Sequence, residues 1–108
     1  MEYSIAKSFS KYPAGRFRSD GDYSGERLRD EVLVPKLREL DPVVVDITGT
    51  EGFGSSFLEE AFGGLVRAGW SLGQLEAKLE IKADKPTEFY KKAIWRYIKE
   101  EAERCRNF

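Results

Sequence analysis

The stretch VVVDITGTEGFGSSFLEEAFGGL at residues 43–65 decides the fold class of this chain. Residues 42–48 form a nearly continuous apolar run, which is typical of a central strand covered on both faces. The glycine-rich residues 49–54 predict a loop, and the apolar spacing after them predicts a helix to about Arg67, stopped by Gly69. The stretch therefore predicts a buried strand, a loop at its carboxyl end and a helix.

The start of this helix is the most informative local feature. We expect the helix to begin at Ser55 or Ser56, because Ser56 and Glu59 have the spacing of a capping box. Gly63 and Gly64 fall in its middle, where each glycine costs about 1 kcal/mol relative to alanine. A close approach of the helix to a sheet is the expected compensation.

The flanking segments extend the same alternation of strands and helices. Residues 2–9 and 78–83 alternate as strands do, and a helix is predicted from Ser24, with a kink or restart at Pro35. A last helix is predicted over residues 86–104. This order predicts an α/β layer fold with right-handed crossovers, formed by a single domain over residues 1–108.

Composition excludes several classes of protein. The 108 residues are 41% apolar and 34% charged, which fits one well-packed core, and the net charge of −1 offers no global field for nucleic acid or anionic membranes. The absence of histidine excludes imidazole catalysis and histidine-ligated metals. Cys105 is the single cysteine, so no internal disulfide is expected. We expect a cytoplasmic protein with no membrane segment, metal or cofactor, present as a monomer or weak homodimer.

Two charged clusters favour ordinary structural roles. Glu59 and Glu60 resemble a catalytic pair, but neighbouring helix residues point about 100° apart. We expect Glu59 to complete the helix cap and Glu60 to face solvent or a partner, and we expect no catalytic residues. The last helix is basic on one side but interrupted by glutamates, which favours a solvated face over a nucleic-acid surface. Its basic and aromatic residues are Lys91, Lys92, Trp95, Arg96, Tyr97, Lys99 and Arg104.

The serine-led helix start is a candidate anion site. Amide donors and the positive end of the helix dipole favour a negative group there. A phosphate on Ser56 would gain from that field and would add roughly two negative charges. The simpler alternative is that Ser56 only caps the helix.

Two motifs resemble a known family. GRFRSDGDYSGERLRDEVLVPKL (residues 15–37) and VDITGTEGFGSSFLEEAFGGLVR (residues 45–67) resemble the bacterial STAS-like domain family of unknown function, and more distantly the STAS domains of anti-sigma-factor antagonists. The resemblance implies a STAS-like sandwich with a small mixed sheet and helices mainly on one face. It also implies a non-enzymatic signalling module that binds a partner protein.

The resemblance to antagonists assigns roles to four residues. In such antagonists, the second serine of an Asp-Ser-Ser-Gly-Leu-like motif is phosphorylated by a partner kinase of the GHKL ATPase class, which releases the antagonist. Ser55 and Ser56 match the serine pair, and Ser56 matches the phosphoacceptor. Leu58 matches the motif leucine, and Asp46 matches the acid at the end of the strand. The implied partner is a GHKL-type ATPase or a related sensor or regulator.

The sequence departs from the antagonist motif at two positions. Gly54 replaces the motif aspartate, and Phe57 replaces the glycine after the serines. Phe53 and Phe57 flank the loop and are candidate anchors for a partner, with burial in the core as the alternative. We therefore treat Phe53, Gly54 and Phe57 as candidate partner-binding residues.

The motif at residues 15–37 supports a second hypothesis. Arg16 and Arg18 carry forked donors suited to phosphate or carboxylate, and Ser24 and Gly25 open a helix. If this loop lies beside the loop that precedes Ser56, these groups would form a binding or catalytic site for a phosphate-bearing small molecule or nucleotide. The alternative is that both arginines are solvated or pair locally. An antitoxin-like or defence-associated adaptor is a third option with the same surface.

Overall fold

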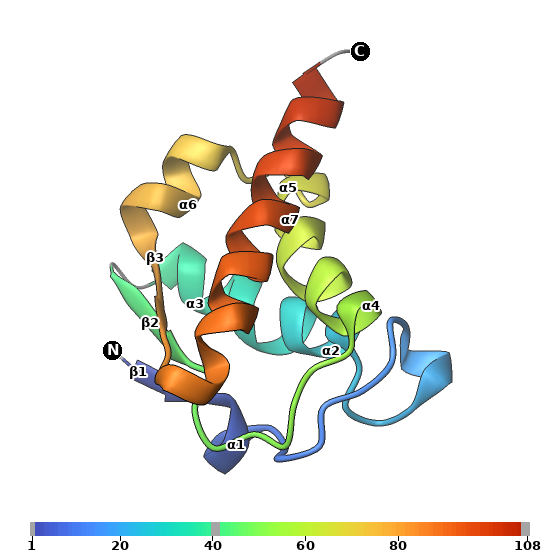
Figure 1. Cartoon of the computed structure of the whole chain (residues 1–108). Coiled ribbons are helices and arrows are strands. Elements are labelled where there is room, and N and C mark those ends of the chain that lie inside the picture. The colour runs from blue at the N-terminus through green and yellow to red at the C-terminus, as the bar shows by residue number, and fades with distance from the viewer. Residues whose placement is uncertain (1, 40–41, 107–108) are drawn as a thin grey trace.

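The computed structural model describes residues 2–39 and 42–106, and consists of a three-stranded sheet packed against helices (Figure 1). The apolar side chains of the sheet and of the helices belong to one buried core. In chain order the elements are β1 (Glu2–Ser4), α1 (Ile5–Ser8), α2 (Gly25–Leu28), α3 (Val34–Glu39), β2 (Val43–Asp46), α4 (Ser55–Leu58), α5 (Gly64–Arg67), α6 (Leu72–Lys78), β3 (Leu79–Lys82) and α7 (Glu88–Arg106).

The sheet has the order β1-β2-β3, and both pairs of neighbours run parallel. The prediction of a central strand at residues 42–48 is therefore confirmed. The expected mixed sheet is wrong for the part of the chain described. The helices between successive strands return the chain to the end of the sheet where the previous strand began, so the strands run parallel.

Only one face of the sheet is covered. Val43 and Val45 of β2 are fully buried in the core, whereas Val44 and Asp46 are only half-buried. On the open face, Val44 lies between Glu2 and Glu80 of the outer strands. The apolar run thus predicted the strand, but its interpretation as a strand covered on both faces was wrong.

Two helical segments differ from the sequence prediction. The first strand ends at Ser4 instead of continuing to residue 9, because the Ser4 side chain accepts a hydrogen bond from the amide of Lys7 (3.2 Å) and starts α1. Helix α6 was not predicted at all. It begins with a capping box in which Ser71 and Gln74 each bond the other's backbone amide.

Helices 25–39 and 55–67 are the two long helices before α7, and each contains a π-helical turn. The first π-helical segment is Arg29–Leu33, between α2 and α3. The second is Glu59–Gly63, between α4 and α5. Pro35 lacks an amide donor and crowds the carbonyl four residues earlier, so the turn just before it is widened while the helix continues through Pro35 to Glu39.

These two helices approach each other closely at Gly25. A β-carbon on Gly25 would lie 2.4 Å from the Phe57 carbonyl oxygen. Gly64 leaves room for the Arg29 guanidinium, since its β-carbon would lie 2.5 Å from Arg29 Nη1. The mid-helix glycine therefore accommodates a side chain from the neighbouring helix, and the expected close approach to a sheet was wrong.

Gly69 ends the second helix as predicted. Its φ is +111°, a conformation that glycine adopts without strain. The Gly69 amide donates to the Val66 carbonyl and the Trp70 amide to the Leu65 carbonyl, both at 3.0 Å. This is the Schellman pattern, and it turns the chain toward α6.

Candidate functional site

The serine pair opens helix 55–67, and both serines are exposed. The N-cap is Gly54, with φ −74° and ψ 149°, and the Leu58 amide makes the first helical bond to the Gly54 carbonyl (3.2 Å). Ser56 is therefore the second residue inside the helix, and the expected capping box with Glu59 was wrong. Within the described residues, neither serine hydroxyl has a hydrogen-bond partner.

A glycine N-cap leaves this helix start unusually open. Gly54 has no side chain to accept bonds from the first-turn amides, unlike Ser24, Ser71 or Asp84 at the starts of other helices. The first-turn amides can therefore donate hydrogen bonds to a group near Ser55 and Ser56, and the helix dipole favours a negative charge there.

Beneath the serines lies an aromatic cluster. Phe57 is fully buried, so it belongs to the core and its candidate role as a partner anchor was wrong. Phe53 is half-buried and stacks on Phe57 with 5.8 Å between ring centroids. Tyr90 of α7 meets the Phe53 ring edge-on at 5.2 Å, which fixes the loop against that helix.

Two strongly exposed aromatic residues flank this loop, and the sequence reasoning missed both. Tyr12 is 70% exposed and Phe89 is 72% exposed. The Glu51 amide donates to the carbonyl of Lys11, the neighbour of Tyr12 (2.8 Å), and Phe89 meets Tyr90 edge-on at 5.6 Å. The chain segment after α1, the loop before α4 and the start of α7 lie at the same end of the molecule (Figure 1). The signal for Phe89 was its position beside the apolar stripe of the last helix.

Asp46 has a local structural role at the start of the same loop. Its Oδ1 accepts hydrogen bonds from the Thr48 amide (2.9 Å) and the Thr48 hydroxyl (2.6 Å). These bonds close a tight turn directly after β2. The carboxylate thereby shapes the path of the chain from β2 into the loop.

The residues of the second hypothesis do not meet in one open site. Arg16 Nη1 donates to Glu59 Oε1 (2.5 Å) and Glu60 Oε1 (3.1 Å), so the loop lies beside helix 55–67 through ion pairs. Arg18 instead bonds Glu31 (2.9 Å).

Ser24 and Gly25 are both buried at the start of helix 25–39. The Ser24 hydroxyl accepts from the Arg27 amide at 3.2 Å, which confirms the predicted cap. A hydroxyl that is fully buried in this way is not available to an external ligand.

Arg16 is one part of a larger arginine–glutamate network. Arg67 bonds Glu59 (2.8 Å) and Glu101 of α7 (2.7 Å). Glu60 pairs with Arg29 of the neighbouring helix as well as with Arg16, and is only 7% exposed. The expectations that Glu59 completes the cap and that Glu60 faces solvent or a partner were both wrong, because arginines of the same chain bind both carboxylates. The network comprises Arg16, Arg29, Glu59, Glu60, Arg67, Glu101 and Arg104.

The network lowers the pKa of two of its carboxylates, Glu59 and Glu101. Hydrogen bonds from Arg67, and then from Arg16, lower the pKa of Glu59. Burial by itself would raise the pKa of Glu101, but the hydrogen bond from Arg104 and the charge of Arg67 lower it overall. Carboxylates held in this way are poor proton donors or acceptors at neutral pH, so the network fastens elements together.

Over residues 2–39 and 42–106, no group of three or more acidic or cysteine side chains is placed to hold a metal ion. No helix there is both long and apolar enough to cross a membrane.

An α/β domain with a small sheet, in which a loop after the central strand leads to a serine-led helix, is the class of domain that the sequence resemblance implied, although the sheet is parallel instead of mixed. Residues 24–88 match the family described as STAS-like domain of unknown function (DUF4325). The match covers more than half of the chain, and the chain therefore belongs to this family. No curated protein and no solved structure matches the chain.

Proposed function

We propose that this STAS-like domain is a non-enzymatic switch that binds an ATPase- or kinase-type partner and is controlled by phosphorylation of Ser56. One observation carries the proposal: the Ser56 hydroxyl is exposed and unpartnered in the first turn of a glycine-capped helix. Ser56 also occupies the position that corresponds, by resemblance, to the antagonist phosphoacceptor.

The local electrostatics favour a phosphate at this position. The first-turn amides lack a side-chain acceptor, so a phosphate on Ser56 can accept bonds from them and gains from the helix dipole. The modification adds roughly two negative charges to residues 52–56, which carry no charged side chain. A charge change of this size alters docking without requiring a change of fold.

The docking surface in this proposal is residues 52–56 together with Tyr12 and Phe89, which we call the serine-loop surface. Exposed aromatic side chains supply large apolar contact areas in protein interfaces. Among the residues that the structure describes, Tyr12 and Phe89 are the two most exposed large apolar side chains, and they flank the loop on two sides. A partner that covers both would also lie against the loop that leads to Ser56.

Phosphorylation is tested by recovering the tagged chain from its source cells under phosphatase inhibition. We expect the intact mass and phosphopeptide map to place phosphate on Ser56. Ser55→Ala is the matched control and retains the phosphate, whereas Ser56→Ala loses it and no longer responds to ATP. If Ser56→Ala binds the ATPase partner and responds to ATP as the wild type does, the switch proposal is wrong.

The docking surface is tested with the ATPase that co-purifies with the chain. We expect Tyr12→Ser and Phe89→Ser each to weaken binding about tenfold or more, in line with loss of an interface anchor. Phe17→Ser replaces an exposed aromatic outside the serine-loop surface and should leave binding unchanged. Equal effects from all three variants would argue against this surface.

A further inference from the structure

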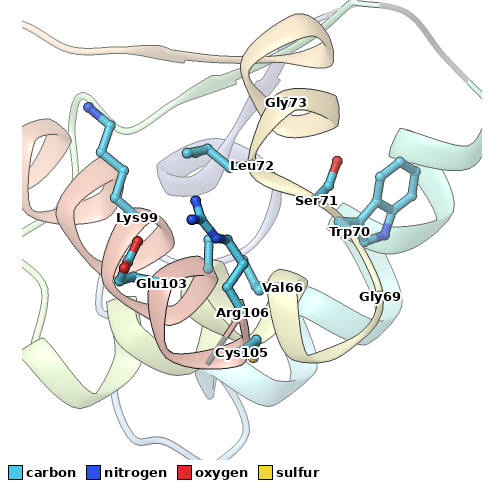
Figure 2. Close-up of a pocket in the computed structure, with 11 residues that line it drawn as sticks. Val66, Gly69, Trp70, Ser71, Leu72, Gly73, Lys99, Glu103, Cys105 and Arg106 are labelled. Carbon is cyan, nitrogen blue, oxygen red and sulfur yellow. The ribbon is translucent and has the colours of Figure 1, made fainter. Parts of the chain in front are cut away.

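A separate hollow lies at the other end of helix 55–67, away from the serines. Its volume is about 480 Å³, and it is bounded by the turn after that helix, the start of α6 and the last turns of α7 (Figure 2). Cavities of this size are typical of sites for small molecules. Neither the proposed switch nor the family description assigns it a role.

The hollow has apolar walls on both sides. Val66 comes from helix 55–67, Trp70 and Leu72 from the turn and the start of α6, and Ala102 from α7. All four side chains are half-buried, so part of each remains open to the cavity. Trp70 is further held by Lys78, whose ammonium lies 5.6 Å from the ring centroid.

The charges at the hollow favour an anion. Lys99 and Arg106 line it, against the single carboxylate of Glu103. In the described part of the chain neither cation takes part in an ion pair or hydrogen bond. Figure 2 shows the Arg106 guanidinium extending over the hollow toward Leu72. An unpaired guanidinium beside apolar walls is suited to a carboxylate or phosphate carried on an apolar body.

We propose that this hollow binds a soluble amphipathic monoanion, with its apolar part against Trp70 and Leu72 and its anionic group on Arg106 and Lys99. The arginine provides a planar, bidentate contact, while the lysine adds a flexible second charge. Because the hollow and the serines lie at opposite ends of one helix, this site and the proposed switch can be tested independently.

The test uses octanoate as the probe and 1-octanol as its uncharged match. The chain has two tryptophans, so its nitrogen–proton correlation spectrum contains two indole signals, and Trp95→Phe assigns the Trp70 signal. We expect octanoate to shift the Trp70 signal and to leave that of Trp95 in place. Arg106→Ala should weaken octanoate binding about tenfold while leaving the weaker binding of octanol unchanged.

Lys92→Ala is the matched control, because Lys92 is an exposed cation on the same helix outside the hollow. It should leave octanoate binding unchanged, whereas Lys99→Ala should weaken it. The proposal is wrong if octanoate leaves Trp70 unmoved, or if octanol binds as tightly as octanoate and Arg106→Ala has no effect.

Two other occupants would also overturn the proposal. Dimerisation in analytical ultracentrifugation, with a Trp70 signal that depends on protein concentration, would assign the hollow to contact between copies of the chain. Sedimentation with phosphatidylglycerol vesicles, without any response to monomeric octanoate, would assign it to a lipid surface.

Discussion

Two consecutive turns of helix 55–67 differ in whether their polar side chains have partners. In the first turn, Ser55 and Ser56 are exposed and have no side-chain partners in the described chain. In the next turn, Glu59 and Glu60 are bound by Arg16 and Arg67, and Glu60 also by Arg29. In the sequence, both pairs are simply polar residues on one amphipathic helix.

The difference comes from residues far away in the chain. Arg16 reaches Glu59 across 43 residues, and Arg67 reaches Glu101 across 34. Arg67 of the same helix and the distant Arg16 and Arg29 bind the glutamates, whereas no side chain of the described residues binds the serines. Chemical availability on this helix is therefore decided by tertiary partners.

The largest expected effect on stability comes from removing the buried carboxylate of Glu60. Glu60→Ala should lower the free energy of unfolding by about 3–5 kcal/mol, because it removes a buried carboxylate that pairs with three arginines. Of these, the half-buried Arg29 would keep only Asp30 and the Glu60 carbonyl as partners. Urea denaturation measures the change. Glu51→Ala, on the exposed loop, should stay within about 0.5 kcal/mol of wild type. A loss below about 1 kcal/mol for Glu60→Ala would mean that the network is not energetically important.

Helix 25–39 contacts helix 55–67 at Phe57, between the serines and the glutamates, and Gly25 tests this contact. Gly25→Ala should cost about 1–3 kcal/mol, because the new β-carbon would meet the Phe57 carbonyl. Gly73→Ala is the matched control: it lies in α6 with nothing within 4 Å, and should add about 0.5–1 kcal/mol of stability. Thermal unfolding compares them, and equal shifts would contradict the close approach of the helices.

Acid should lower the stability of the folded protein by protonating Glu59 and Glu101. The pKa values of Glu59 and Glu101 are lowered in the folded state, so folding favours their ionised forms. This stabilisation is fully present above the glutamate pKa of the unfolded chain, and is lost as the pH falls through the lower folded-state values. The urea midpoint should therefore drop between about pH 5 and pH 3. Glu101→Gln should show a shallower drop, and an unchanged slope would argue against the assignment.

The smallest expected effect on stability distinguishes Ser24, which caps a helix, from Ser56, whose hydroxyl has no partner. Ser24→Ala should cost about 1 kcal/mol, because the Ser24 hydroxyl accepts from the Arg27 amide. Ser56→Ala should change stability by less than about 0.5 kcal/mol, since Gly54 is the N-cap. Chemical denaturation of the two variants side by side tests this, and a comparable loss for Ser56→Ala would restore its interpretation as a cap.

Signals that lie within a few residues predicted the fold well. The cap at Ser24, the stop at Gly69 and the central strand each follow from local chemistry and are confirmed. Helix α6 also had such a signal, the capping box from Ser71, which the sequence analysis overlooked.

The candidate site was less predictable, for a physical reason. The serine pair itself was found from its motif, but its capping residue is a glycine, which leaves no side-chain signal in the sequence. The ion pairs of Arg16 with Glu59 and Glu60 join residues 43 and 44 positions apart, and local patterns carry no information about such contacts. Exposure of Tyr12 likewise depends on how loops assemble.

The arginine–glutamate network has a consequence for the lifetime of the folded molecule. The ion pairs of Arg16 with Glu59 and Glu60 and that of Arg67 with Glu101 close chain loops of 43, 44 and 34 residues, so we expect them to form late in folding. Glu60→Ala should therefore accelerate unfolding and leave the folding rate nearly unchanged, as stopped-flow measurements across urea concentrations would show. When a protease cleaves faster than the unfolded chain can refold, the rate of proteolysis follows the unfolding rate. The ion pairs of Glu60 should therefore lengthen the time for which the folded protein resists such a protease.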